Sequence, residues 1–256
     1  MSDLVLAASQ TRYSLVGFLR NPRAFVFTIV MPLFLLVIMN TIFGHLTTFT
    51  GGQGAAVYYT PAMVGYQVTW TGFATLGVTV VADREAGLLK RFRGTPMPSW
   101  VYLAAEMVRT LVVVVCTVAA LVLVGGLFYG VHVSLDALAG LVVYTLVGTG
   151  AMSSVGLAVT RACPTTDAAS ALGPFVVVVL AFISGVFVPL SLMPTWMVDL
   201  GKVFPLEHLA AGLRAAFSRP GSTGITALDV GVLALWGIGA TLVSLRTFRW
   251  EPLAQR

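Results

Sequence analysis

AFVFTIVMPLFLLVIMNTIFGHLTTFTGGQGAAVYYTPAMVGYQVTWTGFATLGVTVVA, residues 24–82, contains no Lys, Arg, Asp or Glu. A helix that crosses the hydrocarbon core of a bilayer, which is roughly 30 Å thick, needs about 20 mainly apolar residues. The 59 residues of this stretch are too many for one such helix. They predict two membrane helices joined by a short uncharged connection.

The composition of the whole chain supports a membrane protein. Of 256 residues, 57% are hydrophobic and 10% are charged, and the mean hydropathy is +0.92. Soluble domains carry about 25% charged residues, so this chain has too few ionisable groups to cover a soluble fold. A disordered chain and a disulfide scaffold are excluded on the same grounds.

Four further runs without Asp, Glu, Lys or Arg follow, at residues 110–135, 137–160, 168–198 and 230–245. Together with the first stretch they predict an all-α protein, a single transmembrane domain over residues 1–256, with six membrane helices. The predicted helices cover about residues 24–46, 58–82, 110–130, 137–159, 169–190 and 227–248.

The basic residues predict the orientation. With the N-terminus in the cytoplasm, twelve of the fifteen Lys and Arg residues fall in cytoplasmic segments. Since Lys and Arg are retained on that side, both termini are expected there, in a multi-pass protein of the cell membrane. The pI near 9.6 then reflects topology and attraction to anionic lipid, and it gives no support to nucleic-acid binding.

The N-terminal residues 1–23 lack the order of a cleavable signal and predict a helix lying in the membrane interface. Leu4, Leu15 and Leu19 alternate there with Arg12 and Arg20. Pro22 disfavours helix at the preceding residue, so a break is expected between this helix and the first span.

The most polar connection is DREAGLLKRFRGTPMP, residues 83–98. Residues 83–93 predict a short amphipathic helix in which Leu88, Leu89 and Phe92 form an apolar edge among basic side chains. One interpretation is a basic cytoplasmic loop that only sets topology. The other is a helix that docks into a groove of a cytosolic partner and transmits force to the membrane. The docking candidates are Asp83, Arg84, Glu85, Leu88, Leu89, Arg91 and Phe92.

The connection before the last span contains three prolines, Pro189, Pro194 and Pro205. They cannot lie within one regular lipid-exposed helix without leaving backbone groups unpaired. The fifth span is therefore expected to end near Pro189. Short helices in the outer leaflet should follow, with an amphipathic piece over residues 206–217 lying at the surface. Two interpretations of this region remain open. It is either an extracytoplasmic cap that binds no ligand or a part of the substrate path.

A polar stripe runs along the second predicted span, where Gln67, Thr71, Thr75 and Thr79 recur every fourth residue. Such groups must face protein or water, so they either hold helices together or line a substrate path. Asn40 and Phe187 are weaker candidates for the same path. Neighbouring aromatic residues could form an apolar wall for large amphiphiles; these are Phe43, Tyr58, Tyr59, Tyr66 and Trp70.

Enzymatic activity is not predicted. The chain has no GxxxxGK[ST] loop for nucleotide phosphates. Ser153 and Ser154 do not fit the GxSxG motif, and no His lies in the middle of a predicted span to act as base. Their glycine-rich surroundings indicate closely packed helices instead. The three His residues and two Cys residues lack the spacing of metal ligands, so no bound metal or cofactor is expected.

An ion-coupled secondary transporter or channel is the alternative class. Carriers of that kind use ionisable groups at membrane depth, and the middles of all six predicted spans lack Asp, Glu, Lys and Arg. Energy supplied from outside the membrane domain fits this pattern better.

These motifs, in this order, resemble the membrane subunits of ABC-2 type exporters. The resemblance rests on DREAGLLKR at 83–91 with Thr95-Pro96, SGVFVP at 184–189, Met193-Pro194, and PLEH at 205–208 followed by Arg214. It covers nearly the whole chain and is strongest for the drug-resistance permeases of the daunorubicin exporter group.

The resemblance implies a permease that exports a lipophilic or amphiphilic substrate, such as a drug, a lipid or a glycolipid. It also implies a dimer with a second permease copy and two cytosolic ATPase subunits, which bind the ATP and Mg. The coupling helix of the family falls on residues 83–93, and its broken outer-leaflet helices fall on about 185–217. At Ala86-Gly87-Leu88 the chain is less polar than many members of that family.

Overall fold

A computed structural model describes residues 3–44, 54–89, 99–218 and 221–247. All secondary-structure elements in these ranges are helices. In chain order they are α1 (Asp3–Leu19), α2 (Pro22–Phe25), η1 (Val26–Val30), α3 (Met31–Phe43), α4 (Ala55–Thr69), η3 (Trp70–Thr75), α5 (Leu76–Glu85), α7 (Ser99–Tyr129), α8 (Leu135–Val159), η4 (Thr160–Ala162), α9 (Thr166–Ile183), η5 (Leu190–Leu192), α10 (Thr195–Gly201), α11 (Pro205–Ser218) and α12 (Ala227–Thr247).

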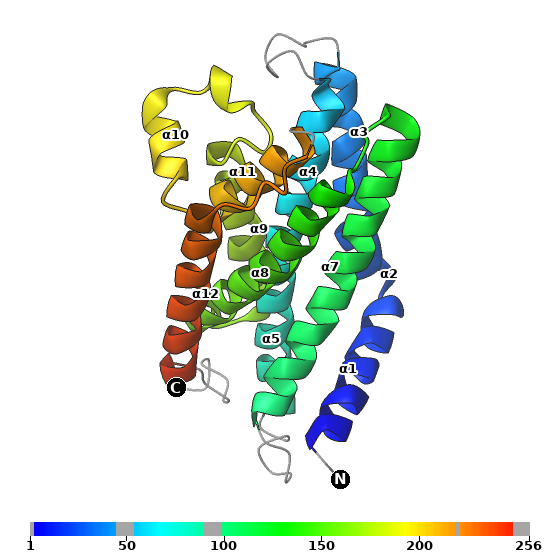
Figure 1. The fold of residues 1–256 in the computed structure, drawn as a ribbon. Helices are drawn as coiled ribbons and strands as arrows, with labels where there is room; N and C mark the ends of the chain where they lie inside the picture. Colours follow the sequence, from blue (N-terminus) through cyan, green and yellow to red (C-terminus); the bar gives the residue numbers. More distant parts are fainter. Residues whose placement is uncertain (1–2, 45–53, 90–98, 219–220, 248–256) are drawn as a thin grey trace.

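The long helices run side by side in one bundle (Figure 1). The start of α1 and the end of α12 lie at the same end of this bundle, below in Figure 1, as the predicted topology requires. Five helical stretches are long and apolar enough to cross a bilayer; they cover Val26–Phe43, Trp100–Tyr129, Leu135–Ala162, Thr166–Ile183 and Ala227–Arg246. The all-α membrane fold is confirmed, and these five stretches match five of the six predicted spans.

The remaining predicted span, residues 58–82, corresponds to the continuous helix formed by α4, η3 and α5. Nearly all of α4 is buried, and α4 contacts α3, α7, α8 and α11. A helix enclosed by other helices needs less apolar surface than one that faces lipid, so it can carry Gln67 and several Thr residues. The six-span count stays a prediction at this position.

Two helices differ in extent from the predicted spans. The third span was predicted from residue 110; α7 begins earlier, at Ser99, and its first turns pack against α1 (Figure 1). The fifth span was expected to end near Pro189, but α9 ends at Ile183. Gly185 has a φ of +70°, a left-handed conformation that ends helices and that glycine adopts without strain.

The helix break before the last span is confirmed, but the placement of its amphipathic piece is wrong. η5, α10 and α11 follow α9 in short succession. Residues 206–217, expected at the surface, fall in α11, where Leu206, Leu209 and Leu213 are fully buried against α4 and α8. The apolar face of α11 is covered by protein because α4 and α8 offer glycine at the contacts: Gly65 faces Ala210, and Gly148 faces Leu209.

Glycine also allows the close contact between α8 and the continuous helix α4–η3–α5, which we call the central helix. The glycine-rich surroundings of Ser153 and Ser154 predicted such close packing. A Cβ atom built on Gly156 would lie 2.7 Å from the carbonyl oxygen of Phe73 and 2.9 Å from that of Gly72. Both are backbone atoms, which a side-chain rotation cannot move aside. Gly156 therefore allows the backbones of α8 and η3 to touch.

Replacing Gly156 with Ala is expected to lower the free energy of unfolding by about 1–3 kcal/mol, the usual cost of overpacking. Gly150→Ala is the matched control, because a Cβ at Gly150 has no atom within 4 Å. The control should be neutral or slightly stabilising, since Ala favours helix over Gly. Thermal unfolding of the two purified variants checks this, and equal midpoints would contradict the close contact.

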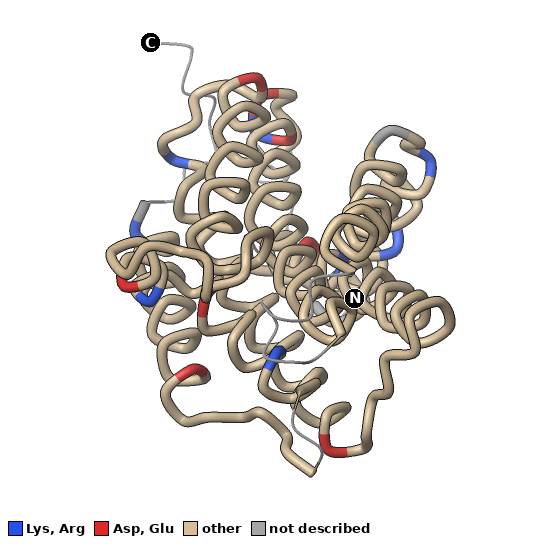
Figure 2. Tube along the Cα trace, turned by 90° about the horizontal axis from the view of Figure 1, so that it is seen from above, with Lys and Arg blue, Asp and Glu red and all other residues tan. Residues whose placement is uncertain are grey.

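Charged residues are sparse in the bundle. Seen from above (Figure 2), Lys, Arg, Asp and Glu occupy few positions along a trace that is otherwise uncharged. Among the described residues, the buried Arg, Asp, Glu and His side chains are Arg84, Glu106, Arg109, Glu207 and His208. These five residues mark two polar clusters within the described part of the chain, one around Arg84, Glu106 and Arg109 and the other around Glu207 and His208.

Candidate functional site

The first polar cluster surrounds the C-terminal end of α5. Arg84 is only 2% exposed, and its guanidinium donates hydrogen bonds to the carbonyl oxygens of Thr160, at 3.0 Å, and of Cys163. These carbonyls lie in the connection between α8 and α9. The planar guanidinium fork can reach two acceptors at once, so Arg84 ties the end of α5 to this connection.

Glu85 makes a second tie to the same connection. Its Oε2 atom accepts hydrogen bonds from the backbone N–H of Thr166 at 2.7 Å and from the Thr166 hydroxyl at 2.6 Å. Thr166 is the first residue of α9, where backbone N–H groups lack helical partners and a carboxylate is favoured. The hydrogen bonds from the Thr166 hydroxyl and N–H lower the pKa of Glu85 below its usual value of 4.5.

A carboxylate with a lowered pKa stabilises the folded protein above its unfolded pKa and loses this contribution as the pH falls through its folded pKa. Glu85→Gln is therefore expected to be less stable than the wild type at neutral pH. The difference should vanish in acid, below the folded pKa of Glu85. Midpoint temperatures of unfolding, measured for the wild type and for Glu85→Gln from neutral to acid pH, check the direction of this effect. Asp167→Asn, which removes an exposed carboxylate from the same first turn of α9, is the control and should have a smaller effect.

The polar cluster continues onto α7 and α1. Arg109 and Glu106 form an ion pair with 2.8 Å between Nε and Oε2, and both side chains are at most 6% exposed. The other carboxylate oxygen of Glu106 accepts a hydrogen bond of 2.5 Å from Ser14 of α1. Arg109 also reaches the Thr79 hydroxyl of α5 at 3.5 Å. α1, α5 and α7 are thus joined by one network.

A further bond links α5 and α7 at this end. The Tyr102 hydroxyl donates to Asp83 at 2.7 Å. Burial raises the pKa of Asp83, while the Tyr102 hydrogen bond opposes this rise. Asp83, Arg84 and Glu85 therefore each bind a different neighbour: α7, the carbonyls before α9, and the first residue of α9.

The structure corrects the predicted helix over residues 83–93. Asp83, Arg84 and Glu85 are the last turn of α5, not the start of a separate helix, and Gly87 with a φ of +73° ends that turn. Leu88 is 37% exposed, whereas Leu89 is fully buried in a cluster with Leu76, Val80, Tyr102 and Leu157. Leu89 therefore does not belong to an exposed apolar edge. Arg91 and Phe92 lie outside the described residues.

Sequence reasoning missed several members of the cluster. Ser14, Tyr102 and Thr166 were not predicted, because each is a common residue whose partner is distant in the chain. Glu106 and Arg109 carried a usable signal, since a charged pair three residues apart on one helix can form an ion pair. For residues 83–85, the sequence predicted which residues belong to the site but did not predict which residues they bind.

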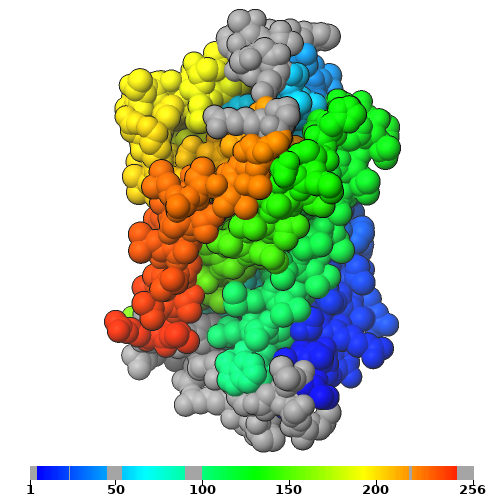
Figure 3. Space-filling model, in the orientation of Figure 1, coloured from blue at the N-terminus to red at the C-terminus, as the bar shows by residue number. Residues whose placement is uncertain are grey.

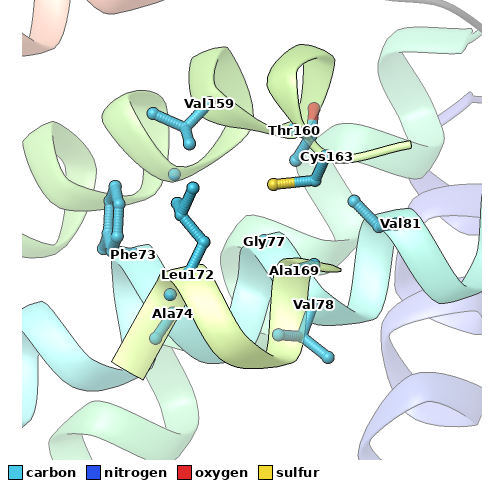
Figure 4. Close-up of a pocket in the computed structure, with 12 residues that line it drawn as sticks. Phe73, Ala74, Gly77, Val78, Val81, Val159, Thr160, Cys163, Ala169 and Leu172 are labelled. Atoms are coloured by element: carbon cyan, nitrogen blue, oxygen red, sulfur yellow. The ribbon is translucent and has the colours of Figure 1, made fainter. Parts of the chain in front are cut away.

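A small cavity of about 20 Å³ lies beside this cluster, between α5, α8 and α9 (Figure 4). Its walls are mostly apolar, from Phe73, Val81 and Leu172, and Cys163 and Thr160 lie at one side. Burial raises the pKa of the Cys163 thiol, and the Arg84 charge opposes this rise. This volume is about that of one water molecule, so the cavity marks a loose contact rather than a ligand pocket.

The polar stripe lies on the enclosed central helix. Gln67 and Thr71 are buried, and the Gln67 amide donates to the Thr71 hydroxyl at 2.9 Å. Thr79 bonds the Thr75 carbonyl of its own helix, and Asn40 bonds the Leu36 carbonyl of α3. Within the described residues, the Gln67 Oε1 atom accepts no hydrogen bond. Of the predicted stripe, Gln67 and Thr71 are thus buried and hydrogen-bonded to each other, and the Gln67 amide retains a free acceptor.

The aromatic residues named from the sequence do gather, together with Phe187. The ring centroids of Phe187 and Tyr66 are 5.4 Å apart, and those of Tyr66 and Trp70 are 5.8 Å apart. Tyr59 lies 5.5 Å from Phe43 and 5.2 Å from Tyr58. These two groups of rings, linked by a hydrogen bond from the Tyr59 hydroxyl to the Phe187 carbonyl, form an aromatic wall along α4 beside the turn after α9.

That turn is fixed by polar contacts. The Tyr58 hydroxyl donates to the Gly185 carbonyl at 2.7 Å, and the Arg214 guanidinium lies 5.3 Å from the Tyr58 ring centroid. Arg214 also approaches the Gly185 carbonyl at 3.4 Å and Glu207 at 3.9 Å. The turn after α9 is thus positioned by side chains from both α4 and α11.

A groove of about 350 Å³ runs along the outside of the bundle, where α8 is recessed between α12 and α7 (Figure 3). Its lining includes Val147, Ala151, Leu233 and Ile238 and is mostly apolar. Ser154 and Thr241 lie in it too, but their hydroxyls bond each other at 3.0 Å. The groove therefore presents hydrocarbon to its surroundings.

No group of three or more His, Cys, Asp or Glu residues that could hold a metal ion occurs in the described part of the chain. Cys116 and Cys163 are both free. The polar clusters described above are built of ties between helices, and this arrangement is suited to transmitting movement.

Comparison with known proteins relates the chain to membrane transport proteins. The family model described as ABC-2 type transporter matches residues 8–218. The chain is also similar to "Putative transport permease YvfS" of Bacillus subtilis (strain 168), with 24% identity over 204 residues, which cover 76% of this chain and 78% of that protein.

Proposed function

The chain belongs to the ABC-2 type transporter family, and from this membership we propose that it exports a lipophilic or amphiphilic substrate with energy from separate ATPase subunits. As a member of that family it is the permease subunit of an ABC transporter in the cell membrane. The family implies association with ABC ATPase subunits, and a second permease copy is part of our proposal.

The observation that carries the proposal is the set of ties made by Arg84 and Glu85. They connect the end of the central helix to the start of α9. Movement of the segment after Glu85 would reach α5 and α9 together, and through Asp83 and Tyr102 it would also reach α7. A push delivered from the cytoplasm can thus reorient several spans as one unit, because packed helices transmit displacement.

The proposed substrate path follows the aromatic wall along α4. Asn40, Gln67, Thr71, Thr75 and Phe187 are its candidate residues. Apolar rings with a few polar groups suit a lipophilic molecule. The free Oε1 acceptor of Gln67 supports a polar contact with the substrate. The other interpretation of the polar stripe is that it only holds helices together. In that case Thr71→Val should lower the stability of the protein and leave its range of substrates unchanged.

Co-expression with the ATPase from a neighbouring reading frame, followed by co-purification and reconstitution in liposomes, tests the function. Leu88→Asp should reduce recovery of the ATPase and the transport of a fluorescent lipid analogue, because a charge would face the partner's groove at a position that is 37% exposed. Ile225→Asp, at a similarly exposed apolar site in the loop before α12 and outside the membrane spans, controls for the added charge.

Two outcomes would overturn the proposal. One is unchanged ATPase recovery and transport in Leu88→Asp. The other is uphill transport by the purified chain alone, driven by an ion gradient without nucleotide, which would establish the secondary transporter instead.

A further inference from the structure

The second polar cluster lies in the half of the bundle opposite the two termini, where the end of α10 meets the first turn of α12 (Figure 1). Its centre is His208 of α11, which is 6% exposed. The His208 Nδ1 atom lies 2.7 Å from Oδ1 of Asp229, and Nε2 lies 2.9 Å from the carbonyl oxygen of Lys202. One imidazole ring thus bridges three elements.

Both atoms that contact the ring are hydrogen-bond acceptors. A carbonyl oxygen can only accept, and so can an ionised carboxylate. A neutral imidazole has one N–H, so with ionised Asp229 it can satisfy only one of these contacts. The observed geometry therefore requires one additional proton, held by the imidazole or shared with the Asp229 carboxyl group.

We propose that His208, Asp229 and the Lys202 carbonyl form a proton-binding site that joins α10, α11 and α12 while the proton is bound. This inference does not rest on the transport function. The ligand is a single proton, and release of that proton replaces one hydrogen bond of the bridge with a contact between two acceptors.

The charges around the ring favour the bound proton. On α11, the Glu207 carboxylate lies 3.9 Å from His208 Nδ1, and Arg214 lies 3.9 Å from the other Glu207 oxygen. The Lys202 ammonium is paired with Asp199 at 2.8 Å. Asp229 also accepts a 2.5 Å hydrogen bond from the Thr226 hydroxyl.

Two tyrosines lie near the carboxylates that face the ring: Tyr144 near Asp229, and Tyr58 near Glu207. Tyr144 of α8 donates to the Gly224 carbonyl, and Tyr58 of α4 lies beneath Arg214. Burial lowers the pKa of His208, but the hydrogen bonds to Asp229 and the Lys202 carbonyl and the two carboxylates outweigh it, so the pKa lies above 6.5.

The sign of the pH dependence follows. A group with a raised pKa contributes fully below its unfolded pKa and loses the contribution as the pH rises through its folded pKa. The bridge is therefore complete below about pH 6.5, and it is lost as the pH rises through the folded pKa of His208. Trp236 of α12, which donates to the Val203 carbonyl at 3.0 Å beside Lys202, is placed to report the separation by its fluorescence.

Nuclear magnetic resonance of the full chain in nanodiscs, with ¹⁵N in the histidine rings, tests the site directly. Between about pH 5 and about pH 9, the His208 ring should titrate with a midpoint above 6.5. The His208→Gln variant assigns its signals. Asp229→Asn retains an oxygen acceptor but removes the charge, and it should shift the midpoint to lower pH. His132→Gln, at an exposed histidine, should leave the midpoint unchanged.

Thermal unfolding provides the second readout. The wild type should lose stability as the pH rises through the His208 midpoint, and His208→Gln should show no loss across that range. A neutral His208 ring at pH 6.5 and below, or an unshifted midpoint in Asp229→Asn, would overturn the proposal. If His208→Gln does not fold, the proposal is tested by the ring titrations of the wild type and of Asp229→Asn alone.

Discussion

Replacing Arg84 with Met is expected to reduce transport per ATP hydrolysed by roughly 5- to 150-fold, the range of a typical coupling free energy between sites. Met fills similar space but donates no hydrogen bond, so the Thr160 and Cys163 carbonyls lose the ties to α5. The ATPase subunits would still hydrolyse ATP, because their own site is intact. The measured quantity is the ratio of substrate moved to ATP consumed in reconstituted complexes.

Two further variants separate coupling from folding. Arg161→Met removes an exposed arginine from the same α8–α9 connection and should leave the ratio unchanged. Arg84→Lys keeps the positive charge but lacks the planar guanidinium group. Compared with Arg84→Met, it should recover more of the stability of the fold than of the ratio of substrate moved to ATP consumed. A normal ratio in folded Arg84→Met would show that these ties do not transmit the work of the ATPase.

The largest loss of stability is expected from Arg109→Met. This change removes the cationic partner of the buried Glu106 carboxylate, which keeps its hydrogen bond from Ser14. Removing one partner of a buried ion pair typically costs about 3–5 kcal/mol, because the remaining charge is uncompensated. Thermal and denaturant unfolding of the purified protein measure the effect.

The chain offers a matched control for this pair. Asp199 and Lys202 have the same i,i+3 spacing and the same 2.8 Å distance, but their side chains are 69% and 59% exposed. Lys202→Met should cost at most about 1 kcal/mol, as exposed pairs do. The double variant Glu106→Gln/Arg109→Met should be more stable than Arg109→Met alone. Equal effects at the two pairs would contradict the role of burial.

The candidate site was predictable in part. The residues at 83–85 stood out because they end a long uncharged run and resemble a family motif. Their actual partners, Tyr102, Thr160, Cys163 and Thr166, could not be found, since no local pattern shows which distant backbone carbonyl will meet a guanidinium. For the same reason Leu89 was assigned to an exposed edge although it is buried.

The sequence by itself determined the class of the protein. Runs of uncharged apolar residues require a bilayer, basic residues between them give an orientation, and three prolines after residue 188 exclude one continuous helix from there to the last span. These properties depend on composition and on neighbours in the chain, so they can be seen without a fold.

Only the tertiary structure decided which helix occupies the centre and which groups are buried with it. α11 reads as a surface piece from its amphipathic pattern, yet Gly65 and Gly148 let it pack into the bundle. The ring of His208 carries its extra proton because Asp229 and Lys202 meet it from two other elements. Burial and hydrogen bonding depend on distances between segments remote in sequence, and these distances exist only once the chain has folded.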